Sequence, residues 1–267
     1  MIKSFFFVWQ NISWEIKLKE DNMLTDTHCH VLKEYYDDKK SILDNAKEQG
    51  VLRIINASYN MASSLEVIKD VKKYDNVYGV VGLHPENCLE EFDYKIFDSL
   101  PSKIVGIGEI GLDYHYGKEN KNEQIAIFER QLVIAERLNL PVVIHSRDAT
   151  LDTIEILKRH KVKGVIHSFS GSYETACIYI KMGFVLGVNG VVTFKNCNLK
   201  DVLAKIPLGN IILETDSPYL TPVPYRGRKN EPAHIKDIAM FLCQLYDVDL
   251  TTLENITNEN IKRIFDI

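Results

Sequence analysis

From Leu24 onwards, short apolar segments alternate with segments of helical periodicity, and the alternation repeats eight times. Most of the apolar segments are rich in Val and Ile, as in parallel strands buried on both faces, and parallel strands need crossover helices between them. Eight such units in 267 residues fit one (β/α)8 TIM-type barrel, which typically takes about 250 residues. The predicted strands are 24–28, 52–57, 77–83, 104–109, 142–145, 164–167, 184–188 and 211–215.

The segments between these strands carry apolar residues at helical spacing. In the segment 123–138, Ile125, Phe128 and Leu132 share one helical face, and Pro141 follows where the pattern stops. We interpret residues 23–267 as one domain, because no linker or break in composition interrupts them. The predicted helices are 41–49, 61–74, 123–138, 148–160, 172–182, 199–205, 233–246 and 251–265.

Residues 1–22 do not follow this pattern, and we interpret them as an N-terminal extension upstream of a native start at Met23. An added strand or cap is the alternative. Their apolar stretch is too short for a secretory signal, and no run in the chain reaches the roughly 18 apolar residues that span a bilayer. Five cysteines without a C-x-x-C pair are typical of free thiols in a reducing compartment. We therefore expect a cytoplasmic protein without a membrane partner.

The net charge of −5 argues against a protein that binds long duplex DNA non-specifically, since such binding needs many cationic contacts with phosphates. A small basic patch that recognises a strand end remains compatible with this charge. One such patch lies in the segment 222–232, where three cations fall within four positions. Arg226 in this segment and Arg147 after the fifth predicted strand are candidate phosphate contacts, because a guanidinium can donate two parallel hydrogen bonds to phosphate. Solvated surface charge is the alternative for both.

Ligand-type side chains gather where the predicted strands end, and (β/α)8 barrels carry their functional residues at those ends. His28 and His30 are two positions apart, so both face the same side of a strand and can bind one cation. A single inward histidine is more often a core residue, but several buried carboxylates together are costly without cations. Four imidazoles and two carboxylates suffice for two divalent cations, which suit displacement at phosphorus. The remaining candidate ligands are Glu109, His145, His167 and Asp216.

Several ordered motifs resemble those of the TatD-family metal-dependent deoxyribonucleases, from about Leu24 to the C-terminus. A lone H-x-H pattern is common, whereas this ordered set is specific. Two features depart from the family pattern: residues 1–22, and Ser168 where many relatives have Cys. The motifs are DTHCH at 26–30, GEIGLDYH at 108–115, HSRDA at 145–149, HSFSG at 167–171, NGVVTFKN at 189–196 and LETDSPYLTPVPYRGRKNEP at 213–232.

The resemblance implies an amidohydrolase-like barrel with two divalent metal ions, Mg, Mn or Zn. By motif, His28 and His30 bind one metal with Asp216, His145 and His167 bind the other, and Glu109 bridges them. Asp216 also orients or deprotonates the attacking water, so Asp216 and Glu109 are the catalytic candidates. His84 and the loop of Arg226 contact the substrate phosphate.

The implied activity is cleavage of phosphodiester bonds in DNA, often as a 3′-to-5′ exonuclease on single strands or strand ends, with a role in DNA repair or fragmentation. Two alternatives stay open. The same barrel supports hydrolysis of a small ester, lactone or amide, and a non-catalytic metal-stabilised binding module is the third possibility.

Overall fold

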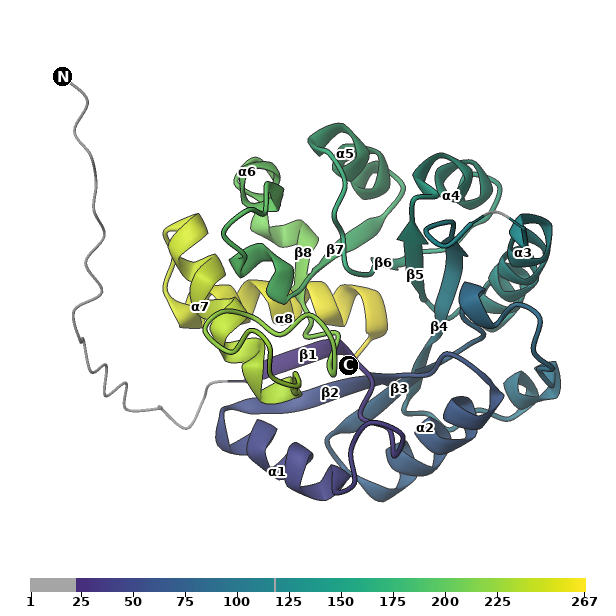
Figure 1. The fold of residues 1–267 in the computed structure, drawn as a ribbon, viewed down its shortest axis with the longest axis horizontal. Coiled ribbons are helices and arrows are strands. Elements are labelled where there is room, and N and C mark those ends of the chain that lie inside the picture. The colour runs from purple at the N-terminus through teal and green to yellow at the C-terminus, as the bar shows by residue number, and fades with distance from the viewer. Residues whose placement is uncertain (1–22, 118) are drawn as a thin grey trace.

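The computed structural model describes residues 23–117 and 119–267. Within them, eight parallel strands are hydrogen-bonded in chain order and form a nearly closed barrel with helices around it (Figure 1). The predicted (β/α)8 barrel is confirmed, whereas the expectation about residues 1–22 lies outside the described residues. The strands are β1 (Leu24–Cys29), β2 (Val51–Ala57), β3 (Val77–Val81), β4 (Ile104–Asp113), β5 (Val142–Arg147), β6 (Gly164–Ile166), β7 (Phe184–Val188) and β8 (Ile211–Leu213).

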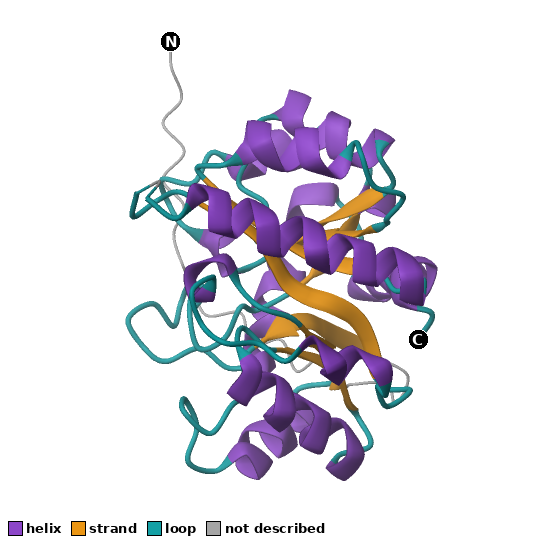
Figure 2. Cartoon of the chain, turned by 90° about the vertical axis from the view of Figure 1, so that its right-hand side faces the viewer, coloured by secondary structure: helices purple, strands orange, loops and turns teal. Residues whose placement is uncertain are grey.

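Helices enclose the strands on the outside, as Figure 2 shows from the side. None of the helices in the described ranges is long and apolar enough to cross a membrane. The helices are α1 (Lys39–Glu48), α2 (Met61–Lys73), α3 (Lys121–Leu138), α4 (Thr150–Leu157), α5 (Tyr173–Lys181), α6 (Leu199–Leu203), α7 (Ile235–Tyr246) and α8 (Leu250–Phe265).

The inside of the barrel is filled by mostly β-branched side chains, and α8 packs against this cluster. The Asn260 amide of α8 donates to the carbonyl oxygen of Ile211, at the start of β8, over 2.8 Å. Helix α8 therefore covers the amino ends of the strands, and a functional site has room only at their carboxyl ends. The buried cluster comprises Ile55, Ala57, Val80, Val105, Val143, Val165, Val185 and Ile212, with Ile261, Ile264 and Phe265 of α8.

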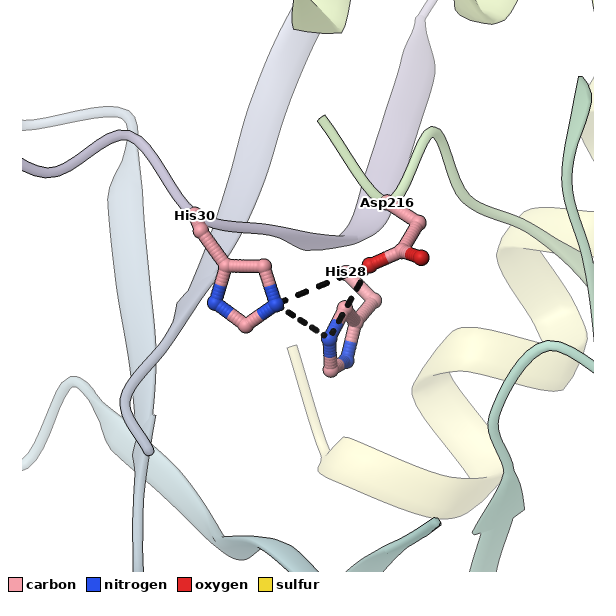
Figure 3. Close-up of side chains that lie close together, drawn as sticks. All are labelled: His28, His30 and Asp216. Atoms are coloured by element: carbon pink, nitrogen blue, oxygen red, sulfur yellow. Dashed lines mark hydrogen bonds and ion pairs between the residues drawn. The ribbon is translucent and has the colours of Figure 1, made fainter. Parts of the chain in front are cut away.

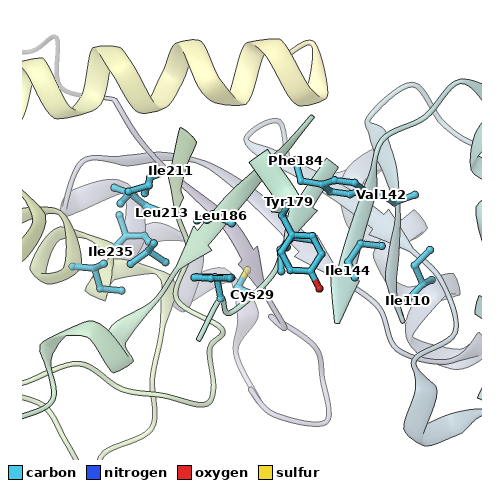
Figure 4. Packing of buried hydrophobic residues seen from close by; sticks show 14 of the residues in the cluster. Cys29, Ile110, Val142, Ile144, Tyr179, Phe184, Leu186, Ile211, Leu213 and Ile235 are labelled. Atoms are coloured by element: carbon cyan, nitrogen blue, oxygen red, sulfur yellow. The ribbon is translucent and has the colours of Figure 1, made fainter. Parts of the chain in front are cut away.

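Side chains that alternate with these point outward and form the larger core between the strands and the helices. Cys29 of β1 is fully buried in this outer core, in the same cluster as Leu186, Leu213 and Ile235 (Figure 4). Since His28 and His30 flank Cys29 in the sequence, the outward position of Cys29 places both imidazoles on the opposite, inner side.

Strand β4 ends at Asp113 and not at Glu109, so the predicted end of this strand is wrong. The register of β4 against β5 shifts around Glu109, and the strand then continues. The continuation depends on Gly111, which has a φ of 145° and lies so close to β5 that a Cβ would sit 1.9 Å from the carbonyl oxygen of His145. Glu109 thus projects from within a long strand, which fixes its backbone on both sides.

The first and last strands meet through the segment that follows β8. The Asp216 amide donates to the carbonyl oxygen of His28 over 2.9 Å, and the His30 amide donates to that of Ser217 over 2.7 Å. Beneath them, the buried carboxylate of Asp26 accepts from the Thr215 amide at 2.9 Å and from its hydroxyl at 2.5 Å. These hydrogen bonds bring residues nearly two hundred positions apart to one edge of the barrel.

Candidate metal centre

His28, His30 and Asp216 form the first of three ligand groups at the carboxyl ends of the strands. The Nε2 atoms of His28 and His30 lie 3.3 Å apart. Oδ1 of Asp216 lies 3.9 Å from Nε2 of His28 and 3.6 Å from Nε2 of His30. Figure 3 shows the two imidazoles and the carboxylate turned towards one another.

Glu109 connects this group to the other histidines, because its two carboxylate oxygens face different partners. Oε2 lies 3.3 Å from Nε2 of His28 and 3.7 Å from that of His30. Oε1 lies 2.8 Å from Nδ1 of His145 and 3.8 Å from Nε2 of His167. The structure therefore brings all the predicted metal ligands together, with Glu109 between two sets of imidazoles.

The distances between the donor atoms match the spacing of ligands around a divalent cation. Metal–nitrogen distances of about 2.1 Å place the corners of a coordination tetrahedron about 3.4 Å apart, and the Nε2 atoms of His28 and His30 lie 3.3 Å apart. Nδ1 of His30 lies 3.0 Å from the carbonyl oxygen of Ala57 and donates its proton there. Nε2 of His30 therefore presents a lone pair to the centre, as a metal ligand must.

Charge within the cluster keeps both carboxylates ionised. Burial raises the pKa of Glu109, but the nearby His167 and the hydrogen bond with His145 outweigh burial and hold that pKa well below its usual value. Burial likewise raises the pKa of Asp216, and the same kind of interaction with His167 and His30 lowers it overall. Both residues are therefore negatively charged at neutral pH and attract cations.

Two of the imidazoles hold protons when no cation is bound. Burial lowers the pKa of His145, but Asp113 and Glu109 outweigh it and raise the pKa to about 9. Burial lowers the pKa of His167 as well, and Glu214, Glu109 and Asp216 raise it to about 10. Cations would therefore take the place of protons at this centre, since a ligating imidazole must be deprotonated.

Comparisons with known proteins agree with this arrangement. A family model described as TatD related DNase matches residues 25–266. The chain belongs to the TatD-related DNase family. The uncharacterized metal-dependent hydrolase YabD of Bacillus subtilis is 39% identical over 92% of this chain and 100% of its own length. YcfH of Escherichia coli K12, named in the same way, is 35% identical over 91% of this chain and 96% of its own length.

Solved structures include that of YjjV, a TatD homologue from Escherichia coli K12. It superposes on this chain with a TM-score of 0.86 at 29% identity, and the match covers 91% of this chain and 98% of YjjV. The match to the TatD family covers nearly the whole barrel, including all the candidate ligands at the strand ends.

Two further carboxylates support the histidines of this TatD-family centre, and the sequence analysis assigned no role to either. Oδ2 of Asp113 lies 2.8 Å from Nε2 of His145. Oε1 of Glu214 lies 3.1 Å from Nδ1 of His167 and accepts from the Ser168 amide at 2.6 Å. A carboxylate behind a ligating histidine fixes the ring orientation and raises its basicity. The sequence did contain a signal for both residues. Asp113 lies four positions after Glu109 and Glu214 two positions before Asp216, and side chains an even number of positions apart on a strand share a face.

His84 lies beside the centre with its donor side turned inward. Its Nδ1 accepts from the Glu86 amide at 3.2 Å, so a neutral ring carries its proton on Nε2, which lies 3.7 Å from Oε1 of Glu109. Burial, followed by the nearby His145, lowers the pKa of His84 to about 3, which keeps the ring neutral. Nε2 is therefore a hydrogen-bond donor aimed at the centre, a role that suits contact with an oxygen and not ligation.

The predicted phosphate contacts Arg147 and Arg226 are both exposed. The Arg147 guanidinium lies over the ring of Tyr116, 5.4 Å from its centroid. That of Arg226 stacks on Phe194 at 3.7 Å. Neither arginine forms an ion pair with a carboxylate within the described residues, so both guanidinium groups keep their N–H donors for a ligand.

Proposed function

We propose that this chain is a divalent-metal-dependent hydrolase that cleaves phosphodiester bonds in DNA, acting as a 3′-to-5′ exonuclease on single-stranded ends. The position of Glu109 carries the proposal. One of its oxygens faces His28 and His30, and the other faces His145 and His167. A carboxylate shared in this way suits a pair of cations.

We assign His28, His30 and Asp216 to one cation, His145 and His167 to the other, and Glu109 to both. Two cations held there, Mg, Mn or Zn, would supply a lowered pKa for bound water and neutralisation of the charge on phosphodiester oxygens. The protein fixes the spacing of the ligands, because their backbone belongs to β1, β4 and β5 and to the segments that directly follow β1, β6 and β8. The carboxylates of Asp113 and Glu214 hold the second pair of imidazoles in place.

Asp216 is the proposed acceptor of the proton from the attacking water. Its Oδ1 makes the contacts with His28, His30 and His167. Its side chain is 14% exposed, compared with 5% for Glu109, so it is the more accessible carboxylate of the two. We assign the proton to Oδ2, the oxygen that does not face the imidazoles.

The substrate phosphate is proposed to lie beside His84. The Nε2 proton of His84 is aimed at the centre and can be donated to a phosphate oxygen. Arg147 and Arg226 have free guanidinium donors and are the proposed contacts for phosphates along the strand. Because these contacts are few, they suit a strand end and not a long duplex.

A nuclease assay tests the proposal. The protein is stripped with EDTA, reloaded with Mg²⁺, Mn²⁺ or Zn²⁺, and incubated with end-labelled single-stranded DNA, duplex DNA, RNA and small esters. We expect metal-dependent shortening of single-stranded DNA from the 3′ end. Asp216→Asn and Glu109→Gln should reduce the rate by about 10²- to 10⁴-fold.

Glu259→Gln is the matched control, because Glu259 is exposed on α8 at the opposite end of the barrel. This variant should cleave DNA as the unaltered protein does. Full activity in Asp216→Asn or Glu109→Gln would refute the assignment of these residues. Turnover of the small esters without any cleavage of DNA would favour the alternative substrate class.

A further inference from the structure

Three tyrosines from three different loops meet beside the metal centre, and no step of the proposed hydrolysis uses them. Tyr35 follows β1, Tyr59 follows β2 and Tyr219 follows β8. The ring centroids of Tyr59 and Tyr219 lie 6.1 and 6.4 Å from that of His30. Tyr35 lies between them, 6.5 Å from Tyr59 and 5.8 Å from Tyr219. We call these residues the tyrosine cluster.

Hydrogen bonds fix the orientation of the tyrosine cluster. The Tyr219 hydroxyl donates to that of Tyr35 over 3.0 Å, and a side-chain hydrogen bond between Tyr35 and Tyr59 continues the chain. The Tyr59 hydroxyl donates to the carboxylate of Glu34. The backbone is also tied to the site, because the Tyr219 amide donates to the carbonyl oxygen of Asp216 over 2.8 Å. The cluster is therefore a fixed aromatic wall and not a set of mobile side chains.

Much of the Tyr219 side chain is not packed against other residues of the protein. Half of Tyr219 is exposed to solvent, whereas the core tyrosine Tyr179 is 1% exposed. Solvated rings beside a reaction centre offer flat apolar surface to a bound substrate. Stacking on aromatic side chains is how single-stranded nucleic acid is commonly held, since every base has a π-face.

Charge restricts which part of a nucleotide fits at this wall. The Glu34 carboxylate, which accepts from the Tyr59 hydroxyl, repels phosphate at this side of the tyrosine cluster. The nearby Lys229 ammonium donates to the carbonyl oxygen of Tyr35. Arg147 follows β5, and Arg226, on the same loop as Tyr219, is stacked on Phe194. A neutral base is compatible with Glu34. We propose that the tyrosine cluster is a stacking platform for the unpaired base of the 3′-terminal nucleotide, with Tyr219 as its main contact.

The platform rests on the proposed nuclease function and makes its substrate more specific. A base paired in a blunt duplex end brings the second strand with it to the wall, whereas an unpaired base does not, so single-stranded ends should be cleaved faster. A terminal abasic residue should also be cleaved more slowly than an ordinary nucleotide. Since one stacked base changes affinity by about 5- to 150-fold, we expect about a tenfold difference for this half-exposed ring.

The test compares two single-stranded oligonucleotides that differ only in whether the 3′-terminal residue carries a base. The unaltered protein should prefer the strand with the base by about tenfold in kcat/KM. Tyr219→Ala should lose this preference, because it cleaves the abasic strand as well as before and the normal strand more slowly. Tyr219→Phe keeps the ring and should keep the preference, as should Tyr173→Ala, which removes an exposed tyrosine on α5.

A binding measurement separates this proposal from the nuclease function. The probe is a strand with 2-aminopurine at its 3′ terminus and a non-hydrolysable phosphonate as its last linkage, in the presence of Mn²⁺. Quenching of 2-aminopurine fluorescence by the unaltered protein and by Tyr219→Phe, but not by Tyr219→Ala, would support the platform. Unchanged quenching in Tyr219→Ala, or equal slowing of both strands by that variant, would overturn it. A failed nuclease function would appear instead as binding without any cleavage of the hydrolysable strand.

Discussion

The carboxyl group of Glu254, on α8, makes the stability of the barrel depend on pH. The residue is 4% exposed, and its Oε1 is buried without a hydrogen-bond partner in the described part of the chain. Burial raises the pKa of Glu254 from 4.5 to about 7. The folded protein therefore binds this proton more tightly than the unfolded chain does. It follows that the free energy of unfolding rises as the pH falls from about 8 towards 4.5, and is reduced at alkaline pH.

The size of the effect follows from the shift. Moving a pKa from 4.5 to about 7 corresponds to at most about 3 kcal/mol in the free energy of unfolding. Since this figure is an upper bound, we expect Glu254→Gln to be about 1–2 kcal/mol more stable than the unaltered protein at pH 8.5. At pH 5, where Glu254 is protonated in the folded protein and the unfolded chain is close to its own pKa of 4.5, the difference should fall below about 1 kcal/mol.

Urea unfolding followed by circular dichroism at pH 5, 7 and 8.5 measures this difference, with EDTA present so that no cation contributes. Glu259→Gln is the control, because Glu259 is exposed on the same helix. The control should follow the unaltered protein at every pH. A stability difference for Glu254→Gln that does not change with pH, or a loss of stability at pH 8.5, would refute the reasoning.

Four further predictions concern the metal centre and the contacts with substrate around it. Glu214→Gln should weaken metal binding by about 10- to 100-fold in a calorimetric titration, because Glu214 orients His167. His84→Gln should lower kcat without changing metal affinity, since Nε2 of His84 bears a proton and does not bind a metal. Arg226→Gln should reduce the slope of log Kd for single-stranded DNA against log salt by about 0.7. Metal affinity should rise from pH 6 to pH 9, with proton release in buffers of different ionisation enthalpy, because His145 and His167 have pKa values of about 9 and about 10; a pH-independent affinity would contradict this.

The sequence sufficed for the barrel and for the gathering of the candidate ligands at its rim, because both depend on local pattern. Val- and Ile-rich runs mark buried strands, and polar residues at the ends of such runs mark the rim. Where the chain breaks this relation, the prediction was wrong. β4 continues past Glu109 because Gly111 permits a close approach to β5. From the sequence alone, a polar residue inside a strand is easily mistaken for the end of that strand.

Contacts between loops were beyond sequence reasoning. No periodicity relates Tyr35, Tyr59 and Tyr219, which meet only because the loops after β1, β2 and β8 adjoin at one edge of the barrel. The role of His84 likewise depends on which nitrogen bears the proton, and only the hydrogen bond from the Glu86 amide fixes that. Motifs therefore identify the chemistry, whereas the tertiary structure decides which atoms face the substrate.

Closure of the barrel and assembly of the metal centre depend on the same hydrogen bonds. The amide of Asp216 is bound to the carbonyl oxygen of His28, so the backbone that joins the last strand to the first also sets the distance between their side chains. Asp26 strengthens this junction from a fully buried position. In an open sheet, ligands from the first and last strands would lie on opposite edges. Closure of the barrel is thus a requirement of the proposed chemistry, because only closure places Asp216 within 4 Å of His28 and His30.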